Sequence, residues 1–125
     1  MAKENYVDGF VLVVPKKKVA AYRKMARGAS KVWKRFGALD YKECRMDDPK
    51  PQFITFTFPK MAKARREETV WFSFITYKNK KHRDAVNKKV MAYFNKKYSK
   101  KKQMSDMPFD MKRVAYAGFR VEVSA

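Results

Sequence analysis

The chain has little cysteine, histidine or glycine, and each shortage excludes a class of protein. One cysteine, Cys44, leaves no partner for an intramolecular disulfide. One histidine, His82, cannot complete a zinc site of the usual type with that cysteine, so we expect no metal and no cofactor. Four glycines, none of them clustered, leave no glycine-rich loop for a nucleotide phosphate.

Long apolar runs are also missing. The longest, residues 10–14, is far too short to cross a bilayer, and no secretory signal pattern is visible. We therefore expect a cytoplasmic protein with no membrane partner. Of the 125 residues, 46% are hydrophobic and 15% are aromatic, which is enough for the core of one domain over residues 1–125.

Acidic residues are scarce beside basic ones: 12 against 31, for a formal net charge of +19. The excess lies in two segments. Residues 16–35 hold nine basic residues and no acid, and residues 78–102 hold eleven basic residues and one acid. Such charge often indicates a nucleic-acid or polyanion partner. In both segments, however, apolar residues recur at spacings of three and four, so the cations occupy the outer side of two helices.

The periodicity predicts long helices over residues 16–36 and 79–97, with Gly37 closing the first and Asn79 as the N-cap of the second. Residues 98–102 should then form a mobile surface loop. A short polar helix is expected over residues 60–68. The strands predicted from β-branched, aromatic and alternating residues cover 6–14, 39–46, 53–58, 70–77 and 113–123.

The predicted order of elements is β-α-β-β-α-β, the split βαβ pattern, once residues 53–58 are set aside as an additional strand. It predicts an α+β fold of the ferredoxin-like type, with an antiparallel sheet and both long helices on one face. Residues 70–77 are almost wholly apolar and aromatic, which predicts burial on both faces of the sheet. Two helices can cover only one face. A second copy packed on the other face by two-fold symmetry would complete the burial, so we expect a homodimer.

Several stretches, in order along nearly the whole chain, carry a family resemblance. They are Tyr6-Val7-Asp8-Gly9-Phe10-Val11, Val14-Pro15-Lys16, Tyr22-Arg23-Lys24-Met25-Ala26, Phe36-Gly37-Ala38-Leu39, Glu67-Glu68-Thr69-Val70 with Phe72-Ser73, Arg83-Asp84 with Asn87-Lys88-Lys89-Val90-Met91, Met107-Pro108-Phe109-Asp110, and Lys112-Arg113 with Gly118-Phe119. Together they resemble the YbaA-like family of unknown function. The resemblance implies a dimeric α+β barrel, a superfamily that includes cofactor-free monooxygenases, haem proteins of the chlorite-dismutase type and many members without an assigned activity.

The motif Met107-Pro108-Phe109-Asp110 is the sharpest local signal. Asp110 could accept backbone N–H groups in a turn or pair with Arg113, a structural role that we favour, or stand as a polar group at the mouth of a pocket. Arg83 and Asn87, one turn apart on the second helix, could bind a ligand carboxylate or phosphate. Alternatively, Arg83 could pair with Asp110 and fasten helix to strand, which we favour of the two.

Asp8 shares a strand face with apolar residues. Burial there would raise its pKa, as a general acid or base requires, but near the strand end it could instead be solvated. Trp71, Ser73 and Tyr77 alternate along the central strand and could line an aromatic pocket, although aromatic residues at this period are most often core.

Nucleophilic catalysis has little support, because Cys44 is expected to be packed and His82 stands among lysines and arginines on a solvated face.

The leading hypothesis is that the protein binds a small, partly apolar molecule between the sheet and the helices, or, if it is an enzyme, converts it. The reaction would be cofactor-free oxygenation or isomerisation of an acidic substrate. The expected ligand-binding residues are Asp8, Trp71, Ser73, Tyr77, Arg83, Asn87 and Asp110. The alternative is an electrostatic binder of nucleic acid or polyanions through the two lysine-rich helices. The expected burial of the helix aromatics argues against it, because single-strand binding needs exposed aromatic side chains among the cations.

Overall fold

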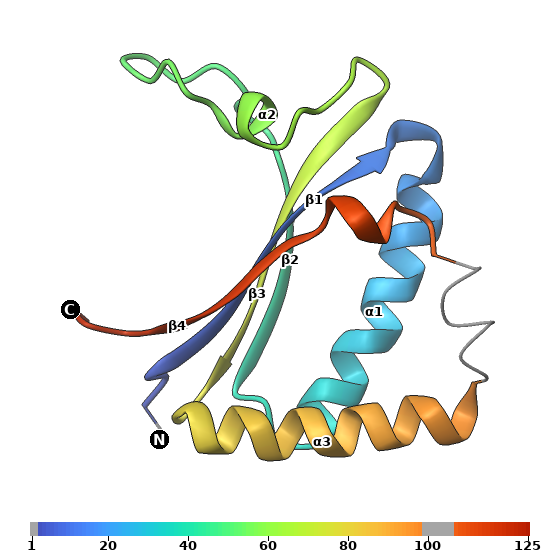
Figure 1. The fold of residues 1–125 in the computed structure, drawn as a ribbon, viewed down its shortest axis with the longest axis vertical. Coiled ribbons are helices and arrows are strands. Elements are labelled where there is room, and N and C mark those ends of the chain that lie inside the picture. The colour runs from blue at the N-terminus through green and yellow to red at the C-terminus, as the bar shows by residue number, and fades with distance from the viewer. Residues whose placement is uncertain (1–2, 99–106) are drawn as a thin grey trace.

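The computed structural model describes residues 3–98 and 107–125, which form one antiparallel sheet with its long helices on one side (Figure 1). Four strands make up the sheet in the order β2-β3-β1-β4. They are β1 (Tyr6–Pro15), β2 (Asp40–Arg45), β3 (Glu68–Tyr77) and β4 (Ala115–Arg120). The central strands β1 and β3 pair over their whole length. This strand order is that of the ferredoxin-like α+β fold, so the expected fold class is confirmed.

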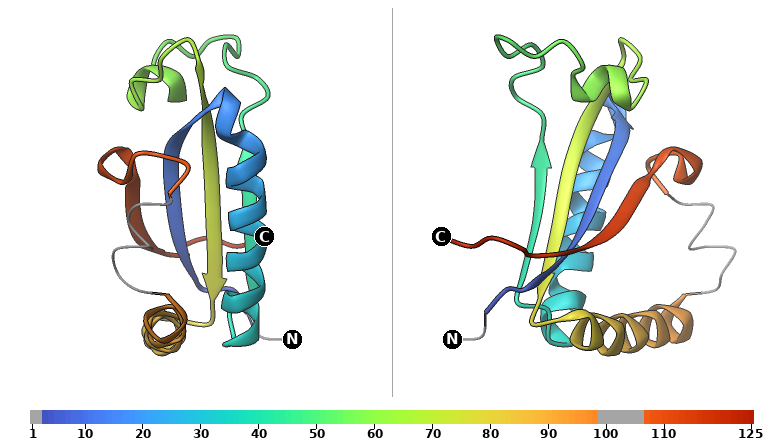
Figure 2. Two further views of the ribbon diagram at one scale, coloured as in Figure 1. Left: turned by 90° about the vertical axis from the view of Figure 1, so that its right-hand side faces the viewer. Right: turned by 60° about the vertical axis from the view of Figure 1, so that its left-hand side comes forward.

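The two long helices lie on the same side of the sheet but not side by side. Helix α1 (Val19–Arg35), entered through a 3₁₀ turn at Lys16–Lys18, runs along the sheet, whereas α3 (Lys80–Lys97) crosses at the end where β1 begins (Figures 1 and 2). Asn79 accepts a hydrogen bond from a first-turn N–H at 2.7 Å, so the predicted N-cap is confirmed. Gly37 adopts φ +115° just after α1, a conformation that favours glycine and closes the helix as predicted.

Residues 53–58 do not form the predicted fifth strand. The backbone of Phe53 is left-handed, with φ 67°, and its side chain is almost fully exposed, so the alternating residues here have no buried face. Pro51 and Pro59 flank the segment, and because each lacks an N–H, a strand ladder could not extend past them. The expected polar helix over residues 60–68 is wrong as well. A four-residue helix, α2 (Phe58–Met61), lies here instead, and the chain is irregular from there to β3.

The other predicted strands are confirmed, with a difference at the end of the chain. The last strand is shorter than residues 113–123, because a 3₁₀ turn, η2 (Met111–Arg113), precedes it and pairing with β1 ends at Arg120. Of residues 98–102, predicted as a mobile loop, 99–102 lie outside the described residues.

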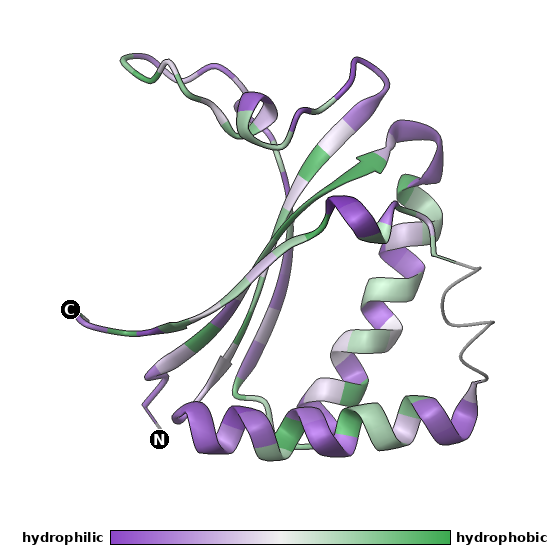
Figure 3. Ribbon diagram, in the orientation of Figure 1, coloured by the Kyte–Doolittle hydropathy of each residue, from purple (hydrophilic) through white to green (hydrophobic). Residues whose placement is uncertain are grey.

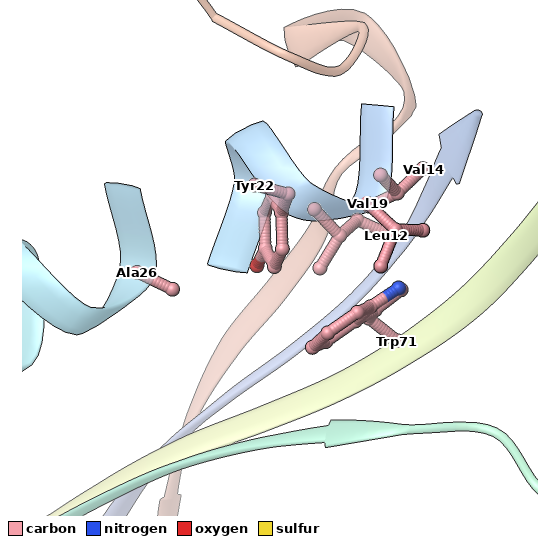
Figure 4. Packing of buried hydrophobic residues seen from close by; sticks show 6 residues of the cluster. All are labelled: Leu12, Val14, Val19, Tyr22, Ala26 and Trp71. Carbon is pink, nitrogen blue, oxygen red and sulfur yellow. The ribbon is translucent and has the colours of Figure 1, made fainter. Parts of the chain in front are cut away.

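Burial on the helix side of the sheet follows the alternation of β1 and β3. Two clusters of buried side chains fill this side. The first, between α1 and the sheet, consists of Leu12, Val14, Val19, Tyr22, Ala26 and Trp71 (Figure 4). The second, where α3 meets the end of α1, consists of Ala38, Ile75, Tyr77, Val86 and Val90. Each large apolar side chain contributes about 2 kcal/mol through burial, so these clusters hold both helices against this face.

The opposite face of the sheet carries no helix in the described ranges except the short α2 at one end (Figure 2). Apolar side chains nevertheless alternate onto it: Phe72 is 40% exposed and Phe119 is 55% exposed. Figure 3 shows hydrophobic residues along these strands and in the segment before α2. Cys44, directly opposite Phe72, is exposed on the same face, so the expectation that it is packed is wrong. On the helix side, β3 is buried from Thr69 to Tyr77. On the other face Val70 and Thr76 are buried but Phe72 is exposed, so the predicted burial on both faces holds only in part in the single chain.

Candidate functional site

Asp8 is the one charged residue of β1, and its side chain is buried. It lies on the helix side of the sheet, directly opposite Gly118 of β4 and Ile75 of β3. Only 2% of the side chain is exposed. Of the two alternatives that the sequence left open, burial is confirmed and solvation is wrong.

Arg83 reaches Asp8 from the first turn of α3. Its Nη1 donates to Asp8 Oδ1 at 2.8 Å, and its Nε donates to Asp84 Oδ1 at 2.8 Å. The guanidinium also lies over the Tyr6 ring, 5.0 Å from the centroid. The predicted pair of Arg83 with Asp110 is wrong, because α3 begins beside the Tyr6 end of β1 whereas Asp110 lies near the other end of that strand.

Tyr116 of β4 completes this group of side chains. Its hydroxyl donates to Asp8 Oδ1 at 2.9 Å and also contacts Arg83 Nη1. Its ring packs against Phe10, with centroids 4.9 Å apart. Tyr116 is 50% exposed, whereas the Arg83 side chain is 13% exposed. We call Tyr6, Asp8, Arg83 and Tyr116 the Asp8 cluster, which extends from a half-exposed tyrosine to a buried carboxylate.

Burial sets the proton affinities in the Asp8 cluster. It raises the pKa of Asp8 above its ordinary value of 3.8, against the opposing effects of the Tyr116 hydrogen bond and the Arg83 charge. Burial and the hydrogen bond to Asp8 raise the pKa of Tyr116 to about 12. Tyr116 therefore keeps its proton at neutral pH and donates it to Asp8 in a hydrogen bond. A carboxyl group perturbed in this way, next to a cation, is a candidate functional group.

Asn87 lies behind the Asp8 cluster and connects it to α1. It follows Arg83 by one turn of α3, and its Oδ1 accepts hydrogen bonds from Trp33 Nε1 at 3.1 Å and from the Tyr77 hydroxyl at 3.3 Å. Four of the seven expected site residues, Asp8, Tyr77, Arg83 and Asn87, are thus brought together.

The other three expected site residues lie elsewhere. Trp71 is buried in the first core cluster, where its Nε1 has no hydrogen-bond partner among the described residues. Ser73 lies beside Glu43. Asp110 caps η2 by accepting from the Lys112 N–H at 2.9 Å, which confirms the favoured turn. The seven residues therefore do not line one pocket.

A second carboxylate, Glu43 of β2, is partly buried on the same side of the sheet and was not among the expected site residues. The Tyr22 hydroxyl donates to its Oε1 at 2.7 Å, and the Tyr41 hydroxyl donates to its Oε2 at 2.9 Å. Burial raises the pKa of Glu43, while hydrogen bonds from these tyrosines and from Ser73 oppose the shift. No ion pair to Glu43 occurs within residues 3–98 and 107–125. We call Tyr22, Tyr41 and Glu43 the Glu43 cluster.

Tyr6 and Tyr116 are also candidates that the sequence did not single out. Tyr6 belongs to the same face of β1 as Asp8, so the alternation of the strand could have placed the two together. Tyr116 could not have been placed in this way. The register of β4 against β1 brings it beside Asp8, and no local pattern encodes that register.

No three His, Cys, Asp or Glu side chains come together as a metal site in the part of the chain that the structure describes. His82 is half-buried and not solvated as expected. Its ring packs edge-on against Tyr77, and its Nδ1 accepts from the Lys78 N–H at 3.0 Å. The histidine therefore helps to close the turn between β3 and α3.

The outer sides of α1 and α3 carry the basic residues, as the periodicity predicted. Tyr22 is buried, but Tyr93 stands among cations. The Arg35 guanidinium lies 5.8 Å from the centroid of the Tyr93 ring, and Lys97 Nζ lies 5.4 Å from it. Neither of these helices, nor any other described helix, combines the length and apolar character that a bilayer crossing requires.

Comparison with known proteins agrees with the resemblance in the sequence. Residues 5–111 match the family described as "Protein of unknown function (DUF1428)". The chain is similar to the uncharacterized protein YbaA of Escherichia coli K12, with 44% identity over 116 residues that cover 92% of this chain and 94% of that protein. The YbaA proteins of Escherichia coli O157:H7 and Shigella flexneri are similar to the same extent. None of these descriptions names an activity.

Proposed function

The chain belongs to the DUF1428 family of proteins of unknown function, and we propose that it binds a small, partly apolar molecule with an acidic hydroxyl, such as a phenol or an enol, at the Asp8 cluster. One observation carries the proposal. A hydrogen bond connects Tyr116, a residue that is 50% exposed, to the buried carboxylate of Asp8, so the residue that bonds the carboxylate also meets solvent.

The open end of the Asp8 cluster suits an oxygen that bears negative charge. Arg83 supplies a permanent cation there. The Tyr116 hydroxyl donates its one proton to Asp8 in the free protein and would turn it to the ligand oxygen when the ligand binds. Both would stabilise a phenolate or enolate oxygen over its protonated form. The Tyr116 ring, packed on Phe10, offers an aromatic surface for the apolar part of the same ligand.

A structural reading of the same contacts is that Arg83 only fastens α3 to the sheet. A buried ion pair adds little net stability, however, because desolvation of the two charges offsets their attraction. Apolar side chains of similar volume would fasten the helix equally well. Fastening also requires no half-exposed tyrosine, so the position of Tyr116 between Asp8 and solvent supports binding.

In the enzymatic form of the proposal, Asp8 accepts a proton through Tyr116. A C–H or O–H group of the ligand gives its proton to the Tyr116 oxygen, the Tyr116 proton moves to Asp8 Oδ1, and the negative charge stays on the ligand oxygen beside Arg83. Return of the proton to a different ligand atom completes an isomerisation and restores the protein. The raised pKa of Asp8 supports this role, because it brings the carboxyl closer to the proton affinity that a general base needs.

We also propose that the open face of the sheet is covered by a second copy of this chain. Phe72 and Phe119 on this face, and Val123 after β4, are exposed although apolar. The segment before α2 and the segment after β4 both project on the open side of the sheet (Figure 1). A copy related by two-fold symmetry would fit between these segments and bury the apolar face.

Sedimentation analysis tests this dimer. The wild-type protein is expected to sediment as a dimer at micromolar concentration, and Phe72→Glu should convert it to a folded monomer. A monomeric wild-type protein would overturn the dimer while leaving the Asp8 cluster untouched.

4-Nitrophenol is a suitable probe of the Asp8 cluster, because ionisation of its hydroxyl changes its absorption spectrum. At about 0.15 M salt, we expect the protein to bind the phenolate form and to shift the NMR signals of Arg83 and Tyr116. Tyr116→Phe should weaken binding about tenfold. Tyr41→Phe is the matched control, since it removes a hydroxyl donor from Glu43 instead, and should leave binding unchanged. Equal weakening in both variants, or none in Tyr116→Phe, would contradict the proposal.

The alternative function is electrostatic binding of nucleic acid, and the position of Tyr93 between Arg35 and Lys97 is the observation that favours it. Titration of a single-stranded oligonucleotide at increasing salt tests this alternative. Micromolar binding that persists near physiological salt and is lost in Tyr93→Ala would support it. Binding that vanishes in moderate salt would mean that the basic helices attract polyanions only non-specifically.

A further inference from the structure

A half-open cavity of about 320 Å³ lies at the end of β1 away from the Asp8 cluster and shares no residue with it. Val13 and Pro15, from the end of β1, form part of an apolar wall. Phe109 continues this wall, and its ring is fixed by edge-on packing against Tyr22, with centroids 5.6 Å apart. The wall is therefore held by the core of the protein.

Charged side chains surround the apolar wall, and most of them already have partners. Glu68 accepts two hydrogen bonds from Arg113, at 2.6 and 3.0 Å, and Asp110 is engaged in capping η2. The side chains of Lys18 and Arg65 are exposed and form no hydrogen bond or ion pair in the described ranges 3–98 and 107–125, although the Arg65 backbone N–H donates to Glu68 Oε1 at 2.7 Å. Two cations at the rim of the cavity are therefore available to a ligand.

We propose that this cavity binds a small organic carboxylate with a short apolar chain. The carboxylate oxygens would accept hydrogen bonds from Lys18 and Arg65, while the chain lies against Pro15 and Phe109. Three basic and two acidic side chains line the cavity, for a net charge of +1, which one carboxylate neutralises. A phosphate dianion would bring two negative charges close to the acidic side chains of the lining, so the cavity favours the monoanion.

Butyrate, titrated into the wild-type protein at about 0.15 M salt and followed by NMR, tests the proposal. We expect butyrate to shift the signals of the apolar wall. Lys18→Ala combined with Arg65→Ala should weaken binding about tenfold. The matched control combines Lys17→Ala with Arg66→Ala, which removes the same charge at exposed neighbouring positions and should leave binding unchanged.

Three outcomes would overturn the carboxylate site. Equal weakening in both double variants would mean diffuse attraction to a basic surface. Inorganic phosphate that binds as tightly as butyrate, without shifting the apolar wall, would mean a general anion site. The absence of any butyrate-induced shift would mean that the cavity takes no such ligand. Thermal unfolding of each variant verifies that the fold is intact.

Discussion

Asp8 and Glu43 are two carboxylates on the same side of one sheet, yet their surroundings differ. Both accept hydrogen bonds from tyrosine hydroxyls, and burial raises the pKa of both. Asp8 also has a cationic partner, Arg83, and its tyrosine, Tyr116, is half exposed. Glu43 is bonded to hydroxyls without a cation among the described residues, and the Tyr22 that joins it to α1 is buried.

A shielded carboxylate with a raised pKa is therefore not by itself a binding site. The contacts of the Glu43 cluster end within the protein, where they connect α1 to β2. The contacts of the Asp8 cluster continue to solvent through Tyr116. Access to solvent, more than burial or pKa, therefore separates the candidate binding group from the structural one.

Arg83→Leu should have the largest effect, because it breaks the feature that distinguishes Asp8 from Glu43. A buried Asp8 without its cation is expected to cost about 3 kcal/mol of stability at neutral pH. The cost should be smaller at about pH 5, since Asp8 can then take up a proton and lose its unpaired charge. Urea denaturation at both pH values measures the effect. If Arg83→Leu were as stable as the wild type at both pH values, the Asp8–Arg83 pair would contribute nothing to stability.

Glu43→Gln tests the other carboxylate. Its amide oxygen can accept a hydrogen bond from one tyrosine, but its NH₂ group cannot accept from the second, so we expect a loss of about 1 kcal/mol. The contribution of Glu43 to the free energy of unfolding should decrease as the pH rises. The folded protein binds the Glu43 proton more tightly than the unfolded chain, whose pKa is near 4.5. The resulting stabilisation is present below that pH and is lost as pH rises through the raised pKa.

Thermal unfolding across mildly acidic to neutral pH checks this expectation. The curve of stability against pH should be flatter in Glu43→Gln than in the wild type, because the variant has no group at position 43 to titrate. An identical slope in the two proteins would mean that the pKa of Glu43 is the same in the folded and unfolded states.

Gly118→Ala should have an effect of similar size to that of Glu43→Gln, confined to the Asp8 cluster. The added methyl group would meet the ring and hydroxyl of Tyr6, which must then leave its position beside Arg83, at a cost of about 1 kcal/mol. Gly28→Ala is the control: it lies in α1 with nothing within 4 Å of the added group, and should raise stability by up to about 1 kcal/mol. An unchanged melting temperature in Gly118→Ala would contradict the packing of Tyr6.

The helices and most strands could be predicted because their patterns are local. Apolar spacing located α1, and one residue, Asn79, marked the beginning of α3. The strand predicted over residues 53–58 failed because alternation produces a strand only where another strand pairs with it. Here no strand among the described residues pairs with the segment: Phe53 has a left-handed backbone, and residues 53–56 are exposed.

The candidate site could be predicted only in part. Residue type and spacing singled out Asp8, Arg83 and Asn87, but the partner of Arg83 was wrong because helix periodicity tells which side faces the sheet and not which strand end lies beneath it. Glu43 escaped notice because a glutamate in a polar strand is typical of a solvated edge. Its shielding depends on Tyr22, 21 residues away in the sequence.

The pKa of Asp8, followed by NMR of its carboxyl carbon with and without saturating 4-nitrophenol, tests the binding function of the Asp8 cluster most directly. We predict that this pKa lies above 3.8 in the free protein and rises further when a phenolate oxygen binds beside Arg83, while the pKa of Glu43 does not move. A probe that leaves the pKa of Asp8 unchanged, or shifts that of Glu43 instead, would show that the Asp8 cluster only holds α3 to the sheet.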